Sequence, residues 1–113
     1  MNVAILCGNL GKDPEVRMTT GGTSVCNFPL ATSSVFKNAD GEKQEQTSWH
    51  SIVCFSGLAD TCGKYLTKGR QVLVDGEIRY RTYDDKEGNK KYITEIVANR
   101  VEFLGGGGND KSA

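Results

Sequence analysis

The chain has 113 residues, of which 37% are hydrophobic and 25% are charged, a length that suffices for one domain with a single core. Fourteen Lys and Arg residues balance fourteen Asp and Glu residues, so the composition predicts no general affinity for polyanions. The sequence has no apolar run near the ~20 residues of a membrane helix and no basic signal-peptide segment at its start, so we expect neither a membrane protein nor a secreted precursor.

The first half of the chain alternates apolar and polar residues in runs that are typical of β-strands. We predict strands over residues 3–10, 15–19, 23–36 and 47–55. Gly21-Gly22 predicts a hairpin turn before the third of these runs. Pro29 inside that run has no N–H to donate, which predicts an edge or bulged strand. Residues 37–46 are polar and predict a loop with Asp40-Gly41 at its tip.

The second half contains the one stretch with helical spacing, followed by two long strand-like runs. We predict a helix over residues 56–66, strands over 70–83 and 90–104, and a hairpin loop over 84–89 between these strands. Ser56 is the expected N-cap of the helix, and Gly69 is its expected C-terminal stop. Gly76 predicts a bend within the first long strand.

This order of elements indicates an all-β fold with one short helix. Strands followed by a single helix and a long hairpin are typical of the five-stranded OB-fold barrel, here with long β-hairpin extensions. The pattern alone also allows an SH3-like barrel or a sandwich. We place the domain at residues 1–104. Four consecutive glycines and a polar end then predict a flexible tail over residues 105–113.

Cysteine and histidine usage gives no sign of a metal site or a catalytic centre. The only histidine is His50, and no Cys-x-x-Cys spacing occurs among Cys7, Cys26, Cys54 and Cys62. We predict free, buried thiols in a reducing cytoplasm. Ser51 points away from His50 in a strand, so the two are not a nucleophile and its base. The sequence has no phosphate-binding loop or hydrolase motif, and we predict a protein that is not an enzyme and takes no cofactor.

Two predicted strands carry aromatic rings and arginines on a face that is not the core. Period-two alternation places Trp49 and Phe55 on one face of their strand and Ile52 on the opposite, apolar face. In the strand after the helix, the outward face ends in Arg79, Arg81 and Tyr83. This combination suits single-stranded nucleic acid, because unpaired bases stack on rings and guanidinium groups hold phosphates.

Less specific interpretations fit the same residues. A lone tryptophan in a strand is often part of the core, and Phe36 at a strand end can hold a loop in place. The two arginines can pair with Glu77 or Asp75 rather than with phosphates. An OB-fold module that binds protein or oligosaccharide, and an enzyme built around Cys54 or Cys62, therefore stay open. Double-stranded DNA is disfavoured because the predicted helix carries one acid and one base.

Five segments share residues, in the same order, with one known family. They are Gly8-Asn9-Leu10-Gly11-Lys12-Asp13-Pro14-Glu15-Val16-Arg17, Leu30-Ala31-Thr32-Ser33, Glu45-Gln46-Thr47-Ser48-Trp49-His50, Tyr65-Leu66-Thr67-Lys68-Gly69 and Val74-Asp75-Gly76. From residue 2 to residue 104 the chain resembles the bacterial single-stranded DNA-binding proteins. The resemblance implies an OB-fold that forms a homotetramer and wraps single-stranded DNA in replication, recombination and repair.

The resemblance also implies roles for individual residues. Base stacking is implied for Phe36, Trp49, Phe55 and Tyr83. Phosphate contacts are implied for Arg17, Lys37, Lys68, Arg79 and Arg81. His50 matches a histidine that lies at a subunit interface in the family. Phe36 and Tyr83 stand where the family usually has tryptophan, so weaker stacking is expected at these two positions.

Other features depart from the family pattern. Val3, Ser51 and Gly57 stand where basic residues are common, so we expect fewer phosphate contacts and a shallower salt dependence, which scales as about 0.7 per neutralised phosphate. The family's acidic tip, Asp-Asp-Asp followed by Ile-Pro-Phe, is not in the sequence, so these residues do not predict docking of replication and repair proteins. A primosome-type OB adaptor is the alternative function. The expected location is the cytoplasm, for a nucleoid-associated bacterial protein or a phage-encoded one.

Overall fold

The computed structural model describes residues 1–104, and the predicted flexible tail over residues 105–113 lies outside the described residues. The elements in chain order are β1 (Ala4–Leu10), β2 (Glu15–Met18), β3 (Ser24–Lys37), β4 (Lys43–Phe55), α1 (Ser56–Tyr65), β5 (Gln71–Asp84) and β6 (Lys90–Phe103). Every predicted strand and the predicted helix are found, with changed ends. In this described part, no helix has the length and apolarity of a membrane span.

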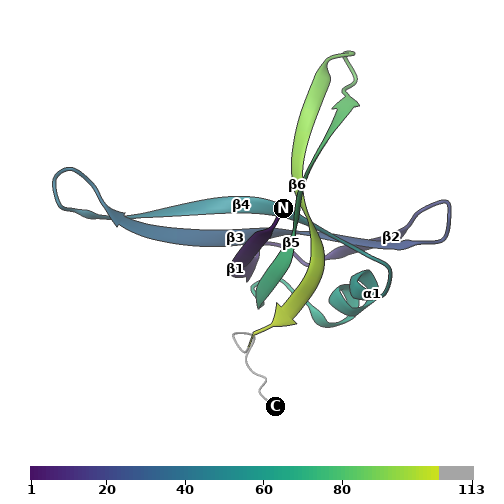
Figure 1. Cartoon of the computed structure of the whole chain (residues 1–113), viewed down its shortest axis with the longest axis horizontal. Coiled ribbons are helices and arrows are strands. Elements are labelled where there is room, and N and C mark those ends of the chain that lie inside the picture. The colour runs from purple at the N-terminus through teal and green to yellow at the C-terminus, as the bar shows by residue number, and fades with distance from the viewer. Residues whose placement is uncertain (105–113) are drawn as a thin grey trace.

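The strands close into a barrel (Figure 1). The sheet order is β1-β5-β6-β4-β3-β2, and β1 also pairs with β3 at Asn9 and Leu10, which joins the two sides of the sheet. The contact between β4 and β6 around Ile52 and Val53 is parallel, and the other strand pairs are antiparallel. A closed barrel of β1, β3, β4, β5 and β6 in this order is the OB-fold, so the predicted fold class is confirmed.

Two hairpins extend beyond the barrel, and both are visible in Figure 1. We call residues 31–49 of β3 and β4 the β3–β4 arm and residues 79–95 of β5 and β6 the β5–β6 arm. The loop predicted over 37–46 is shorter, because β3 and β4 stay paired as far as Lys37 and Lys43. Nearly all residues of this arm are exposed on both faces, so no apolar alternation marks its strands in the sequence.

The core lies inside the barrel and is closed at one end by α1. Its fully buried side chains include Phe28, Leu30, Ile52, Val72 and Val74, and α1 adds Ala59 and Cys62. The predicted bend at Gly76 is confirmed, because the β5–β6 register shifts between Asp75 and Gly76. A Cβ on Gly76 would lie 3.0 Å from the Cα of Ala98, so only glycine permits this close approach of the two strands.

The prediction that Pro29 marks an edge or bulged strand is wrong. β3 pairs with β4 without a register shift on one side, and with β1 and β2 on the other. The carbonyl of Pro29 accepts a hydrogen bond from the N–H of Gly11 at 3.0 Å, in the interval between β1 and β2. The missing N–H of the proline faces the same interval, so no ladder hydrogen bond is lost there.

The ends of the helix also differ from the predicted ones. Ser56 has a φ of 59° and does not cap the helix, whose N-cap is Phe55 without a side-chain hydrogen bond. The C-cap is Leu66 rather than Gly69. Gly69 lies in the following turn, where its N–H donates to the carbonyl of Leu10 at 2.8 Å. A tertiary contact with β1, which helical spacing does not report, therefore determines where the chain turns.

Candidate nucleic-acid interface

The outward face of β4 carries two of the rings predicted to stack on bases. Trp49 is 63% exposed and Phe55 is 44% exposed, whereas Ile52 and Cys54 on the opposite face are completely buried. The alternation predicted for this strand is confirmed. The alternative interpretation of Trp49 as a core residue is wrong.

These two rings line hollows that meet in the middle of the face. The first hollow, of about 410 Å³, lies between Trp49 and the turn that contains Lys12. The second, of about 690 Å³, lies between Phe55 and the base of the β5–β6 arm. Asn27 and Ser51 line both hollows. The two hollows are therefore adjacent, and we call them together the groove.

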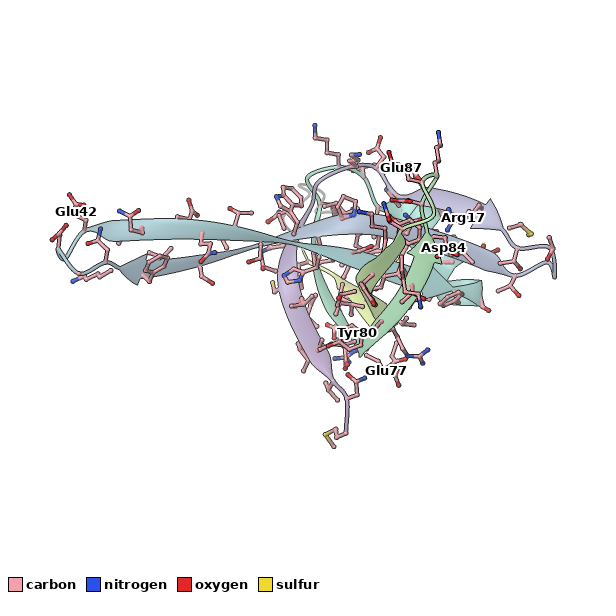
Figure 2. All side chains as sticks on the ribbon, turned by 90° about the horizontal axis from the view of Figure 1, so that it is seen from above. Arg17, Glu42, Glu77, Tyr80, Asp84 and Glu87 are labelled. Atoms are coloured by element: carbon pink, nitrogen blue, oxygen red, sulfur yellow. The ribbon has the colours of Figure 1, made fainter. Side chains whose placement is uncertain are left out.

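The groove has an apolar floor and charged walls. Val53, which is 7% exposed, lies in it together with Ile93 and Val97. Lys12 lines the first hollow, and Arg17 of β2, labelled in Figure 2, lines the second together with Arg79 and Arg81 of β5. An apolar floor accepts the flat face of a base, and cations on the walls are placed to reach the phosphates that connect such bases.

The position of the Trp49 ring depends on Gly11. A Cβ on Gly11 would lie 2.8 Å from Cη2 of the indole, so no larger residue fits there while the ring keeps its place. We expect Gly11→Ala to displace the indole, shift its emission maximum and weaken oligo-dT binding about threefold. The matched control is Gly57→Ala, where the added Cβ meets nothing within 4 Å. An unchanged emission spectrum for Gly11→Ala would contradict the contact.

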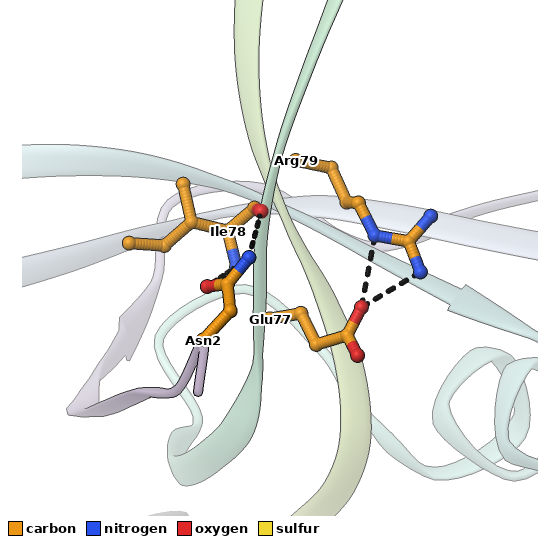
Figure 3. Close-up of polar contacts among 4 residues, drawn as sticks. All are labelled: Asn2, Glu77, Ile78 and Arg79. Atoms are coloured by element: carbon orange, nitrogen blue, oxygen red, sulfur yellow. Dashed lines mark hydrogen bonds and ion pairs between the residues drawn. The ribbon is translucent and has the colours of Figure 1, made fainter.

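Both arginines that β5 places in the groove are held by carboxylates. Arg79 donates through Nε and Nη2 to one oxygen of Glu77 at 2.9 and 2.7 Å (Figure 3). Arg81 donates through the same two nitrogens to both oxygens of Glu95, at 3.0 and 3.2 Å. These hydrogen bonds from Arg81 to Glu95 raise the pKa of Arg81 above its usual value. A phosphate that binds either arginine must therefore share or displace an existing partner.

The other predicted contact residues lie outside the groove. Phe36, which is 48% exposed, and Lys37 are near the end of the β3–β4 arm. Tyr83 is 46% exposed near the end of the β5–β6 arm. Lys68 is closer, because its backbone N–H donates to Oδ1 of Asp13, a residue of the first hollow, at 2.7 Å. The structure thus brings together Trp49, Phe55, Arg17, Arg79 and Arg81, but not the four residues above.

His50 is half-buried and lies on the face of β4 opposite Trp49. Its Nε2 is 2.9 Å from Oγ1 of Thr32, a diagonal neighbour on β3, and His50 is also among the residues that line the first hollow. Among the described residues, 1–104, the other ring nitrogen, Nδ1, has no hydrogen-bond partner. The interface role implied for His50 stays a prediction.

Reasoning from the sequence missed several residues of the groove, among them Lys12, Asn27 and Glu95. Lys12 lies in the turn between β1 and β2. Residues in a turn have no regular alternation, so the sequence does not predict which way the Lys12 side chain points. Glu95 lies opposite Arg79 in the β5–β6 register and reaches the diagonal Arg81. The turn at Gly88-Asn89 was a usable signal for this register, since hairpin turns determine which residues pair.

Three of the four cysteines lie buried in the protein. All four are free, but Cys7 is exposed rather than buried as predicted. The Cys54 thiol donates to Sγ of Cys62 at 3.9 Å, and this hydrogen bond together with burial raises the pKa of Cys54, which keeps it protonated at neutral pH. Burial raises the pKa of Cys26 to about 11. Within the part of the chain that the structure describes, no three metal-binding side chains gather.

A family model described as the single-strand binding protein family matches residues 1–104. The chain belongs to this family. Among its relatives, single-stranded DNA-binding protein 1 of Chlorobaculum tepidum is 52% identical over 106 residues, which are 93% of this chain and 65% of the relative. The single-stranded DNA-binding protein of Xanthomonas axonopodis pv. citri is 47% identical over 96% of this chain and 60% of the relative. The chain thus spans less than two thirds of the length of these two single-strand binding proteins.

Solved structures of single-strand binding proteins have the same fold. The Plasmodium falciparum SSB in complex with ssDNA matches with a TM-score of 0.87 and 33% identity, over 92% of this chain and 95% of that one. The single-stranded DNA binding protein of Thermus aquaticus matches with a TM-score of 0.82 and 29% identity, over 92% of this chain and 50% of that one. The groove described above therefore lies on the barrel of a single-strand binding protein.

Proposed function

We propose that this single-strand binding protein binds single-stranded DNA without sequence preference and protects it during replication, recombination and repair. The observation that supports this most is the groove, which sets the exposed Trp49 and Phe55 rings beside an apolar floor. Its walls carry cations, Lys12, Arg17, Arg79 and Arg81, among the carboxylates of Asp13, Glu15 and Glu95. The proposed role is non-catalytic and takes no cofactor. Paired exposed rings favour DNA binding over the primosome-type adaptor, which typically lacks them.

The proposed binding mode places bases toward the floor and phosphates toward the rim. Bases stack on Trp49 and Phe55, each contributing about 1–3 kcal/mol. Lys12 and Arg17 contact phosphates directly, since the salt bridges found in residues 1–104 do not involve them. Arg79 and Arg81 contact phosphates only when these compete with the glutamates. A neutral protein can bind a polyanion in this way because stacking supplies affinity that charge does not.

Residues on the two arms extend the proposed path of the strand beyond the groove. Phe36 and Lys37 on the β3–β4 arm offer a ring beside a cation, and Tyr83 offers a ring on the β5–β6 arm. Lys68 adds a cation near the Asp13 end of the groove. Because Phe36, Lys37 and Tyr83 lie far from the groove along exposed hairpins, only a strand longer than the groove itself can reach them.

We propose that the protein assembles as a homotetramer through surfaces that include the edge of β1. On one side β1 pairs with β5, but on the other only Asn9 and Leu10 pair with β3, so residues 4–8 have an open edge. Val3 and Ile5 beside this edge are 52% and 63% exposed. Proteins usually cover an apolar edge strand, and in the proposed assembly a second copy of the chain covers β1 by pairing with its open edge. The half-buried His50 is a further candidate for such an interface.

Light scattering tests this assembly. We expect a mass four times the chain mass of 12.3 kDa. A monomer mass would remove DNA wrapping from the proposed mechanism but would leave binding in the groove intact. In a cell, the proposed activity places the protein in the cytoplasm, where a bacterial or phage genome exposes single strands.

Titration with oligo-dT tests the proposed function directly. Trp49 is the only tryptophan, so any change in indole fluorescence reports on the groove. We expect oligo-dT to quench this fluorescence, with a modest loss of affinity between two salt concentrations because few phosphates are neutralised. Binding without quenching would show that the DNA does not contact Trp49. No binding at either salt concentration would contradict the proposed function.

A further inference from the structure

The centre of the groove is occupied by an amide that lies between the two exposed rings. Asn27 lines both hollows, whereas Trp49 lines only the first and Phe55 only the second. Asn27 pairs with Val53 across β3 and β4, which places it on the same face as the rings. A base that stacks on either ring therefore has the Asn27 amide near its edge.

The Asn27 amide is not held by the protein. Its Oδ1 is buried, and within the described residues no group donates a hydrogen bond to it. The side chains of Asn2 and Asn38, by contrast, are committed to structure. Asn2 donates to the carbonyl of Ile78 at 2.8 Å and accepts from its N–H at 3.0 Å, which continues the β1–β5 ladder (Figure 3). Asn38 accepts two backbone hydrogen bonds in the β3–β4 turn.

A carbonyl oxygen without a donor is unfavourable, and a half-turn of the amide brings this oxygen to the groove surface, where a partner that supplies a donor gains affinity. An unpaired base supplies a donor beside an acceptor on its Watson–Crick edge: N3–H and O4 in thymine, N6–H and N1 in adenine, N4–H and N3 in cytosine, and N1–H and O6 in guanine. A side-chain amide carries the same two functions, and its terminal torsion has two wells about half a turn apart. An uncommitted asparagine can therefore match either order of donor and acceptor, and hence any of the four bases.

We propose that Asn27 hydrogen-bonds the Watson–Crick edge of a base in the groove, and that this contact selects unpaired strands rather than a sequence. In a duplex these edges are occupied by the partner strand, so Asn27 would stay without its partner. Glu95 cannot take this role, because a carboxylate only accepts and both of its oxygens already bind Arg81. The proposal rests on single-stranded DNA binding in the groove and adds a second basis for strand selection to stacking.

Oligonucleotides of thymidine and of N3-methylthymidine test the proposal. The methyl group blocks the N3–H donor and leaves the ring able to stack. Using Trp49 quenching, we expect methylation to weaken binding to the wild-type protein about fivefold, and Asn27→Ala to weaken binding of the unmodified strand by a similar factor on dT, dA and dC alike. Methylation should then have no further effect on Asn27→Ala. Independent losses that multiply to about 25-fold would overturn the proposal, as would a methylation effect that Asn27→Ala leaves unchanged.

Two further variants complete the test. Asn99→Ala makes the same chemical change at an exposed position of β6 outside the groove and should bind both strands as the wild type does. Asn27→Leu keeps the branch at Cγ and removes the buried oxygen, so it replaces Asn27→Ala in the comparison of the two strands if Asn27→Ala folds poorly. Quenching of the wild type by unmodified oligo-dT separates the outcomes. If unmodified oligo-dT does not quench the wild-type protein, the proposed function is contradicted. If it does quench, but methylation weakens binding equally in the wild type and in Asn27→Ala, only this inference is contradicted.

Discussion

Replacing Trp49 with alanine is expected to weaken oligo-dT binding about 5- to 150-fold, which corresponds to ~1–3 kcal/mol for one stacked base. The indole is 63% exposed and Trp49 lines the groove, so its removal takes away contact with DNA and little from the core. Binding must be followed with labelled oligo-dT, because the variant has no tryptophan of its own. Thermal unfolding by circular dichroism should show an unchanged midpoint within a few degrees.

Trp49→Phe is the matched control for this prediction. It retains an aromatic face at the same place on β4 and should recover most of the lost affinity, because stacking depends on a flat ring rather than on the indole N–H. If Trp49→Ala instead unfolds, the ring is needed for the stability of the fold. The loss of binding by this variant then carries no information about stacking. If the alanine variant is folded and binds as tightly as the wild type, the groove is not the binding site.

Replacing Glu95 with glutamine is expected to tighten oligo-dT binding about tenfold at low salt. Arg81 donates two hydrogen bonds to the Glu95 carboxylate, and a phosphate has to compete with that carboxylate for the same guanidinium. Glutamine removes the negative charge and releases the arginine. A tenfold gain in affinity corresponds to about 1.4 kcal/mol, which is near the lower end of the free energy that a hydrogen bond to a charged group contributes. One additional neutralised phosphate should steepen the slope of log affinity against log salt by about 0.7.

Glu102→Gln provides the control for charge. Glu102 pairs with Arg100 at 3.1 Å, and neither residue lines the groove. This variant changes the net charge as Glu95→Gln does, so an equal gain in both would show a general charge effect and not release of Arg81. Weaker binding by Glu95→Gln would show that Glu95 positions Arg81 for the phosphate. Affinities at four or more salt concentrations distinguish these outcomes, because each predicts a different slope.

Local alternation in the sequence was sufficient to predict which side chains of β4 face outward. Trp49 and Phe55 are exposed and Ile52 is buried, because successive side chains of a strand point to opposite faces whatever the rest of the fold does. The tips of both arms were predictable for a similar reason. Gly41 and Gly88 have φ values of 81° and 84°, which glycine adopts without the steric cost that a Cβ adds.

Features that depend on distant neighbours were predicted poorly. Pro29 was expected at an edge, but an interruption between β1 and β2 accommodates it inside the sheet. The returning strand of the β3–β4 arm, β4, was predicted to begin at residue 47 but begins at Lys43. Its first residues were missed because a hairpin that is solvated on both faces has no apolar pattern. Ser56 was expected to cap α1, but the path of the chain out of β4 gives it a left-handed backbone.

The sequence by itself therefore determined the strands, the single helix and the outward direction of Trp49 and Phe55, and its family resemblance implied the OB-fold barrel. Only the tertiary structure decided what surrounds those rings: Lys12 from a turn, Asn27 from β3, and Glu95 from β6 against Arg81 of β5. The physical reason is that alternation relates a side chain to its own strand alone. Strand register and closure of the barrel decide which groups from other strands it meets, and these depend on pairings between residues far apart in the chain.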